Sequence, residues 1–368
     1  MADISELPFQ TLIDALLDED KKFNPRYLYR LSDLEGDELT HFVRTWPQLP
    51  LWRRQALMQD LHELGGADHL LSYENIGRHA LKDEDPQVRL LAVQILWEFE
   101  ELDLVPLYLQ LLGADPVSEV RAASASGLGQ FVYLGELDRL HTRTLQDIED
   151  KLLEAFNTDP DVLVKCKALE ALGFSSRTEI PMLVESAFTS EDPRMKISAL
   201  IAMGRSMDSR WEPTILKMLN DILPGVRAEA ARAAGELEID DAVPTLIELT
   251  SDSEENVRKA AIWSLSQIGG DMARDALQKL FQEADDDHEA DFLESALDNI
   301  AFTDGMEPFS LFDFPEDDSE DELLEMLISQ ESSSEDDING SDRSKLSDQD
   351  FEPLEDTEDH DEQRGIRD

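Results

Sequence analysis

Two His-Glu pairs are the residues of this sequence whose types could bind a catalytic metal ion, namely His62-Glu63 and His288-Glu289. Imidazole and carboxylate groups are common iron ligands, and a site needs several of them within a small volume. The two pairs lie more than 200 residues apart along the chain, and the other histidines stand singly: His41, His69, His79, His141 and His360. We therefore predict no metal site.

Other catalytic chemistry also lacks its usual motifs. The sequence contains no Gly-rich phosphate loop, no Cys-x-x-Cys and no His-Glu-x-x-His. Its single cysteine, Cys166, excludes an intramolecular disulfide and a multi-cysteine metal site, and we expect it to be a small packed residue. The acidic run Asp285–Asp287 lacks the spacing of a calcium-binding loop. We predict no catalytic residue and no cofactor.

Basic residues recur instead at a regular interval, each directly after Val or Met. They are Arg89, Arg121, Lys165, Lys196, Arg227 and Arg258, separated by 32, 44, 31, 31 and 31 positions. Self-similarity at a period of about 20–50 residues is the signature of a solenoid. The elements that position these residues should therefore be stacked repeats.

Prolines mark where the helices of each repeat should begin. Asp-Pro pairs at Asp85, Asp115, Asp159 and Asp192 predict the start of the second helix, since proline is tolerated in a first turn and aspartate caps free amides. Another set predicts the start of the first helix: Pro106, Pro181, Pro213 and Pro244. Each unit should be a helix, a short turn and a helix.

Small residues occur at a fixed phase in the second helix. Eight positions after the basic residue stands a glycine in four repeats, whereas the first and last regular repeats place Trp97 and Ser266 there; the glycines are Gly129, Gly173, Gly204 and Gly235. We expect these positions to let adjacent helices pack closely.

The Asp-Pro, Val-Arg, Ala-Ala and Leu-Gly progression resembles the HEAT repeat, in the short form found in the phycobilisome lyase family. The clearest copies are residues 85–92 and 226–235, and the resemblance covers roughly residues 80–300. It implies an all-α solenoid, a right-handed stack of about seven or eight helical pairs. It also implies that the Asp and Arg positions bond neighbouring repeats, so that the six basic residues form a structural ladder.

Two enzymatic activities occur on similar folds. Some HEAT-like proteins help to attach bilins to phycobiliproteins, but no residue here marks a bilin site. Deoxyhypusine hydroxylase carries a di-iron site on several His-Glu pairs, whereas this chain has the two separated pairs named above. A lyase-like or hydroxylase-like enzyme is therefore an alternative to a binding protein.

The chain divides into four parts by pattern. We expect residues 1–22 to form an amphipathic helix that either caps the stack or binds a partner. Residues 23–80 should form divergent repeats, and residues 81–302 should form the regular solenoid. The long interval between Arg121 and Lys165 holds a small basic cluster, Arg139, His141 and Arg143. We expect this excess to emerge as a surface loop, either simply tolerated or used for binding.

Residues 303–368 predict a disordered acidic tail. They hold 25 acidic and 4 basic residues, with too little apolar surface to offset the ordering entropy. Two apolar islands interrupt the tail: one contains Phe309, Phe312 and Phe314, and the other contains Leu323, Leu324 and Leu327. They are candidate partner-binding segments; the alternative is that they fold back onto the solenoid.

The net charge of −51 bears on the partner. Such a charge repels phosphate backbones and anionic lipid, so nucleic-acid and membrane binding are disfavoured and a basic protein partner is favoured. No secretory signal and no transmembrane run are present in the sequence, so we expect a cytoplasmic protein. The preferred interpretation is a non-enzymatic scaffold; an assembly chaperone for a basic client is a further alternative.

Overall fold

A computed structural model describes residues 7–284 and 286–305, which lie in one compact unit, Met1–Glu307. They form α-helices joined by short loops and 3₁₀ turns, and no strand occurs among them. The predicted all-α solenoid is therefore confirmed for this part of the chain. The first three residues of the predicted tail, 303–305, belong instead to the last helix. The rest of the tail, with its two apolar islands, lies outside the described residues.

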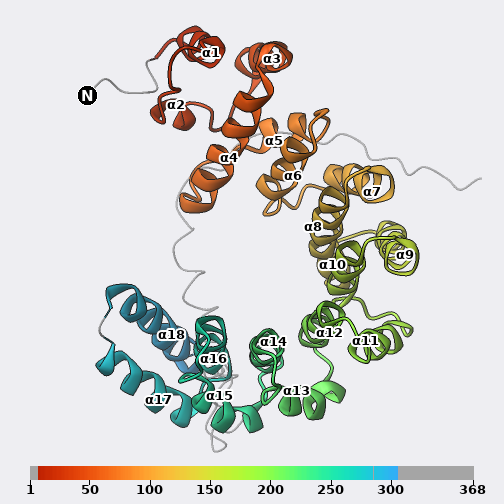
Figure 1. Ribbon diagram of the computed structural model, residues 1–368, viewed down its shortest axis with the longest axis vertical. Helices are drawn as coiled ribbons and strands as arrows, with labels where there is room; N and C mark the ends of the chain where they lie inside the picture. The colour runs from red at the N-terminus through yellow and green to blue at the C-terminus, as the bar shows by residue number, and fades with distance from the viewer. Residues whose placement is uncertain (1–6, 285, 306–368) are drawn as a thin grey trace, which may run out of the picture. The chain divides into compact units, whose positions relative to one another are not determined.

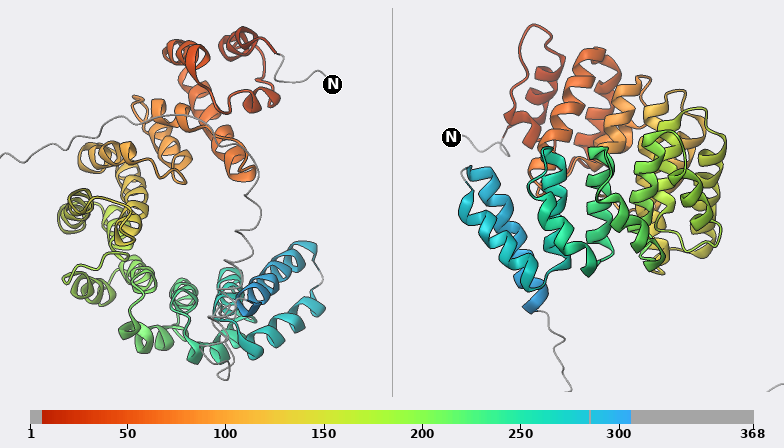
Figure 2. Two further views of the ribbon diagram at one scale, coloured as in Figure 1. Left: turned by 180° about the vertical axis from the view of Figure 1, so that it is seen from behind. Right: turned by 60° about the horizontal axis from the view of Figure 1, so that its bottom comes forward.

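From the third helix onward the helices alternate between two rows (Figure 1). The inner row holds α4 (Leu51–Ala67), α6 (Pro86–Ile95), α8 (Ser118–Glu136), α10 (Val162–Leu172), α12 (Pro193–Arg205), α14 (Pro224–Glu236), α16 (Glu255–Ile268) and α18 (Asp287–Gly305). The outer row holds α3 (Gly36–Thr45), α5 (Glu74–Ala80), α7 (Val105–Ala114), α9 (Thr142–Thr158), α11 (Ile180–Phe188), α13 (Glu212–Met218), α15 (Val243–Leu249) and α17 (Gly270–Glu283). Figure 2 shows the successive pairs standing side by side.

The N-terminal residues belong to the same stack. Helices α1 (Phe9–Leu17) and α2 (Arg26–Tyr29) precede α3, and α1 buries Leu12, Ile13 and Leu16. Helix α1 packs on α3, and α2 packs on α4. The amphipathic face predicted for residues 1–22 is thus turned into the core within its described part.

Aspartates and prolines start the inner helices, although not always as predicted. The Asp85 carboxylate accepts a hydrogen bond from Val88 N at 3.1 Å, and Pro86 is the first residue of α6; Asp192 and Pro193 start α12 in the same way. The prediction was wrong for Asp115 and Asp159, because α8 and α10 begin three residues after them. The carboxylates of both aspartates instead accept a hydrogen bond from the backbone N–H two residues later, in the turn that leads into the helix. They also pair with the arginine of the previous repeat.

Close packing of the inner row depends on the glycines at the predicted phase. A Cβ on Gly173 would lie 2.7 Å from Ala202 Cα, and one on Gly235 would lie 2.8 Å from Ser264 Cα. Gly129 and Gly204 meet the next helix at Ala171 and Ala233 in the same way. Each glycine therefore sits against the backbone of the following inner helix, so the absence of a side chain sets the separation between repeats.

The excess between Arg121 and Lys165 does not form the loop that we expected. It lengthens α8 to 19 residues and α9 to 17, whereas the other outer helices from α7 to α15 have 7 to 10. The added turns bury Phe131, Val132 and Leu152 in the core. Because these residues continue the apolar stripe of their helices, extending the two helices buries more surface than a loop would.

Candidate partner-binding groove

Ion pairs link each of several inner helices to the loop before the next one. Arg89 Nε and Nη2 donate to the Asp115 carboxylate at 2.7 and 2.9 Å, and Arg121 holds Asp159 in the same two-pronged way. The remaining guanidinium nitrogen, Nη1, donates to backbone carbonyls of the arginine's own repeat, Asp83 O in the case of Arg89. The arginine therefore ties together two successive turns.

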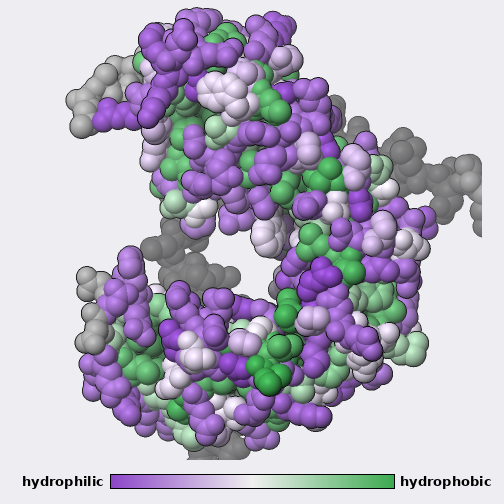
Figure 3. Space-filling model, in the orientation of Figure 1, coloured by the Kyte–Doolittle hydropathy of each residue, from purple (hydrophilic) through white to green (hydrophobic). Residues whose placement is uncertain are grey.

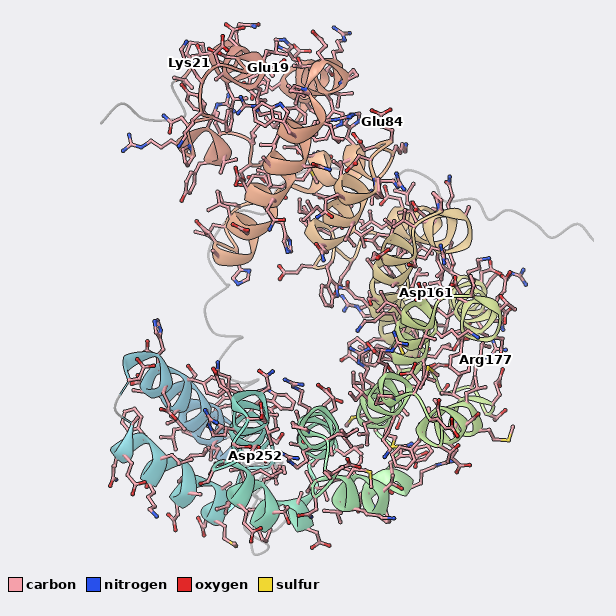
Figure 4. All side chains as sticks on the ribbon, viewed as in Figure 1. Glu19, Lys21, Glu84, Asp161, Arg177 and Asp252 are labelled. Carbon is pink, nitrogen blue, oxygen red and sulfur yellow. The ribbon has the colours of Figure 1, made fainter. Side chains whose placement is uncertain are left out.

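This pattern extends beyond the regular repeats at the N-terminal side. Arg54 in α4 donates to the Asp83 carboxylate at 3.0 Å, and the Trp46 indole donates to the same oxygen at 2.6 Å. On the C-terminal side, Arg227 holds Asp252 at 2.9 Å through two nitrogens, and Arg258 donates to Asp252 O. Figure 4 labels Asp252 in the loop between α15 and α16 and Glu84 in the loop before α6.

Two lysines differ from the arginines. Lys196 Nζ lies 3.3 Å from an Asp221 oxygen and so makes a weaker, single contact to the next repeat. Lys165 Nζ reaches only Asn157 O, at 3.5 Å, and no carboxylate lies within 4.0 Å of it among the described residues. The position that would supply its partner holds Ser190, whose hydroxyl still accepts from Asp192 N.

Hydrogen bonding lowers the pKa of two carboxyl groups in this set. Burial by itself would raise the pKa of Asp159, but the hydrogen bonds from Arg121 and from Asp161 N outweigh it and bring the pKa below its ordinary value. The Arg227 hydrogen bond is the main cause of the lowered pKa of Asp252. Both carboxylates are thus stabilised in their charged form by the fold.

A groove of about 1070 Å³ lies over the C-terminal parts of α4, α6, α8 and α10. Its walls carry five aromatic rings, which are Tyr73, Trp97, Phe99, Tyr133 and Phe174. Polar and charged side chains complete it: His62, His69, Gln94, Glu98, Ser126, Gln130, Lys167, Glu170 and Arg205. Figure 3 shows hydrophobic residues along the inner edge of the stack, where α8, α10 and α12 lie.

Exposure distinguishes the rings of this groove. Tyr73 is buried, whereas Trp97 and Tyr133 remain 57% and 48% exposed. Trp97 occupies the phase that holds Gly129, Gly173, Gly204 and Gly235 in the repeats that follow. An indole cannot enter the space of a glycine, so its ring lies on the surface of the groove.

Three side chains from successive inner segments form a stack on one wall. The Tyr133 and Phe174 rings have their centroids 5.4 Å apart, and the Arg205 guanidinium lies 4.9 Å from the Phe174 centroid. Arg205 Nη1 also donates to Glu170 O at 2.8 Å. This wall of the groove therefore holds a guanidinium group, that of Arg205, over an aromatic ring and beside the C-terminus of α10.

Carboxylates lie next to this stack on α10, where Glu170 is buried, and on α14, where Glu229 and Glu236 are half-buried. Glu170 accepts hydrogen bonds from Ser198 Oγ and Lys167 Nζ, both at 2.7 Å. Burial raises the pKa of Glu229 and of Glu236, and the arginines nearby offset this only in part. Together with Lys167, Arg205 and Arg232, these carboxylates form a mixed charged surface.

The other residues singled out from the sequence do not converge on one site. Arg139 lies 3.4 Å from Glu100, Arg143 lies 3.1 Å from Asp147 in its own helix, and His141 is exposed directly before α9. Within residues 7–284 and 286–305, no three His, Cys, Asp or Glu side chains are grouped so as to hold a metal ion. Cys166 is buried, and burial raises the pKa of its thiol. No helix in the same residues has the length and apolarity that crossing a membrane requires.

Comparison with known proteins bears on the fold. The HEAT repeats family model matches residues 78–147 and 212–298. No curated protein matches the sequence. Solved structures that resemble the chain include the CpcE–CpcF complex of phycocyanin lyase from Nostoc, with 18% identity over 62% of this chain and 94% of that one and a TM-score of 0.41.

Two further solved structures were found to be similar to the chain. Human deoxyhypusine hydroxylase has 17% identity over 80% of this chain and 96% of its own, with a TM-score of 0.34. Yeast importin-β has 14% identity over 81% of this chain and 47% of its own, with a TM-score of 0.44. At these values the similarities assign no activity. The family model thus assigns HEAT repeats to residues 78–147 and 212–298, which lie within the stack of helical pairs described above.

Proposed function

We propose that this protein is a non-enzymatic scaffold or adaptor that binds a partner protein on the inner row of its HEAT-repeat stack. The observation that carries the proposal is the groove over α4, α6, α8 and α10, in which Trp97 and Tyr133 are about half exposed. Exposed aromatic side chains in a hollow are typical anchors of protein interfaces, because they bury a large area when a partner docks.

Charge supplies the second part of the proposal. The acidic tail, residues 303–368, steers a basic partner towards the stack or competes with it for the groove. The apolar islands of that tail and the cluster of Arg139, His141 and Arg143 are accessory contacts in this scheme. The protein acts in the cytoplasm.

Affinity capture with the full chain, compared with residues 1–307, tests this function. We expect the same partner in both captures, with slower association for the shorter chain because steering is lost. Binding of the purified partner should weaken as salt rises to about 0.5 M. Failure to capture any stoichiometric protein, or purification of the chain with a stoichiometric chromophore or iron, would contradict a scaffold and favour an enzyme or enzyme subunit.

A further inference from the structure

The groove continues into a second hollow of different chemistry. This hollow, about 320 Å³, lies over α6, α8 and the start of α10 and is lined mainly by aliphatic side chains such as Leu90, Val93 and Leu163. Both hollows share Gln94, Trp97, Ser126 and Lys167. An aliphatic half and an aromatic half therefore adjoin each other, with Trp97 at the boundary.

The aromatic half favours a positive charge. Glu98 follows the exposed Trp97, and Glu98 and Glu100 flank the half-buried Phe99 in the sequence. Their side chains are 78% and 47% exposed, with His69 at 3.8 Å from Glu98 and Arg139 at 3.4 Å from Glu100. The C-terminal ends of α6 and α8 bring the negative ends of their helix dipoles to the same edge. The charge of −30 outside the tail attracts a cation towards any part of this surface.

The positive groups already in the groove have partners of their own. Lys167 pairs with Glu170 at 2.7 Å, and Arg205 is engaged by Glu170 O and the Phe174 ring. Among the described residues, no lysine or arginine lies over the Trp97 or Tyr133 ring. A partner can therefore form the same kind of contact as Arg205 and Phe174 at the rings of the two preceding repeats, Tyr133 and Trp97.

We propose that this groove binds a partner segment in which a lysine or arginine lies next to an aliphatic residue. The cationic group lies over the Trp97 and Tyr133 rings and near Glu98, while the aliphatic side chain enters the hollow of Leu90, Val93 and Leu163. The inference rests on the proposed function and specifies its recognition chemistry. The chain's own island Phe309–Phe314 is the less suitable occupant, because its acidic surroundings meet Glu98 and Glu100 with like charge.

Immobilised 12-residue peptides probe the full-length protein for this preference. The peptides carry Lys, Arg, Gln or Glu beside Leu in a Gly/Ser background, and one further peptide carries the sequence of residues 307–318. We expect binding of the Lys-Leu and Arg-Leu peptides, and a loss of about tenfold with Trp97→Ala, since cation–π contact and ring burial together contribute on this scale. Tyr133→Ala should lose several-fold, and Trp97→Phe should retain part of the affinity.

A matched aromatic on the outer row controls for general effects. Phe281→Ala removes a ring that is 39% exposed on α17, away from the groove, and should leave binding unchanged. Equal binding of the Gln and Lys peptides, or unchanged binding by Trp97→Ala, would overturn the inference. Preferential binding of the 307–318 peptide would overturn it in favour of the tail as occupant.

Capture of the natural partner distinguishes a failure of the groove assignment from a failure of the proposed scaffold function. If the full chain captures a partner and Trp97→Ala captures it equally well, the scaffold function stands and the groove assignment fails. If neither captures a partner, the scaffold function itself fails.

Discussion

Ser190 stands at the position where the neighbouring repeats have an aspartate, and Lys165 stands where most have an arginine. The Ser190 hydroxyl keeps the turn by accepting from Asp192 N at 3.2 Å, as the Asp221 carboxylate does from Leu223 N at 2.9 Å. It offers no charge to Lys165, which contacts only Asn157 O. The series of inter-repeat ion pairs is thus interrupted between α10 and α12, although the inner helices still pack on each other.

Restoring both residues should restore the missing pair. We expect Lys165→Arg and Ser190→Asp to be coupled favourably in a double-mutant cycle, by about 0.5–3 kcal/mol, because each residue then gains its partner only when the other is present. Urea unfolding of the four proteins measures the coupling. Strict additivity of the two changes would show that the backbone at this step does not bring the two groups together.

Breaking an intact inter-repeat ion pair by removing its arginine should destabilise the protein much more than removing Lys165, which has no such pair. Arg89→Ala leaves the buried Asp115 carboxylate and the carbonyls of Asp83 and Glu84 without their donor, and we expect it to reduce the free energy of unfolding by about 3–5 kcal/mol. Lys165→Ala is the matched control and should change it by less than about 0.5 kcal/mol. Thermal unfolding followed by circular dichroism compares them, and similar losses in both would contradict a stacking role for Arg89.

The sequence period was sufficient to predict the helical pairs, since proline, aspartate and glycine act locally on where a helix begins and how near its neighbour lies. We did not predict the longer α8 and α9 from the sequence, because we expected the extra residues to form a loop. Their apolar residues, such as Phe131 and Leu152, continue the helical spacing of the buried residues before them, and that spacing would have indicated longer helices. The sequence does not predict the groove either, although Trp97 stands out as an exception at a glycine position. Its convergence with Tyr133 and Phe174 depends on the separation and rotation of successive repeats, which no local pattern specifies.

The inter-helix glycines should tolerate no side chain. Gly173→Ala places a methyl group 2.7 Å from Ala202 Cα, where the backbone of α12 must move, and we expect a loss of about 1–3 kcal/mol in stability. Gly66→Ala, in α4, meets nothing within 4 Å and should stabilise the protein by up to about 1 kcal/mol through its better helix propensity. Urea unfolding of both variants tests the contrast, and a neutral Gly173→Ala would mean that the inner row can separate without penalty.

Glu236 should make the protein less stable as pH rises. Burial raises the pKa of this carboxyl, helped by the Glu229 carboxylate and opposed in part by Arg205 and Arg232. A folded-state pKa above the unfolded value of about 4.3 means that the folded protein holds the proton more tightly, so stability falls as pH increases from that value through the folded-state pKa. The opposite holds for Asp252, whose lowered pKa adds stability that is lost only as the solution becomes more acidic than about pH 4.

Glu236→Gln removes this charge while keeping the shape of the side chain. We expect the variant to melt at a higher temperature than the natural protein at pH 7, and the difference to shrink towards pH 4, where Glu236 is itself protonated. Glu98→Gln changes the net charge equally at an exposed position and serves as the control. Thermal melts of the three proteins between pH 4 and 7 measure the effect, and a Glu236→Gln difference that stays constant with pH, or that matches Glu98→Gln throughout, would show that the Glu236 carboxylate is as well solvated in the fold as in the unfolded chain.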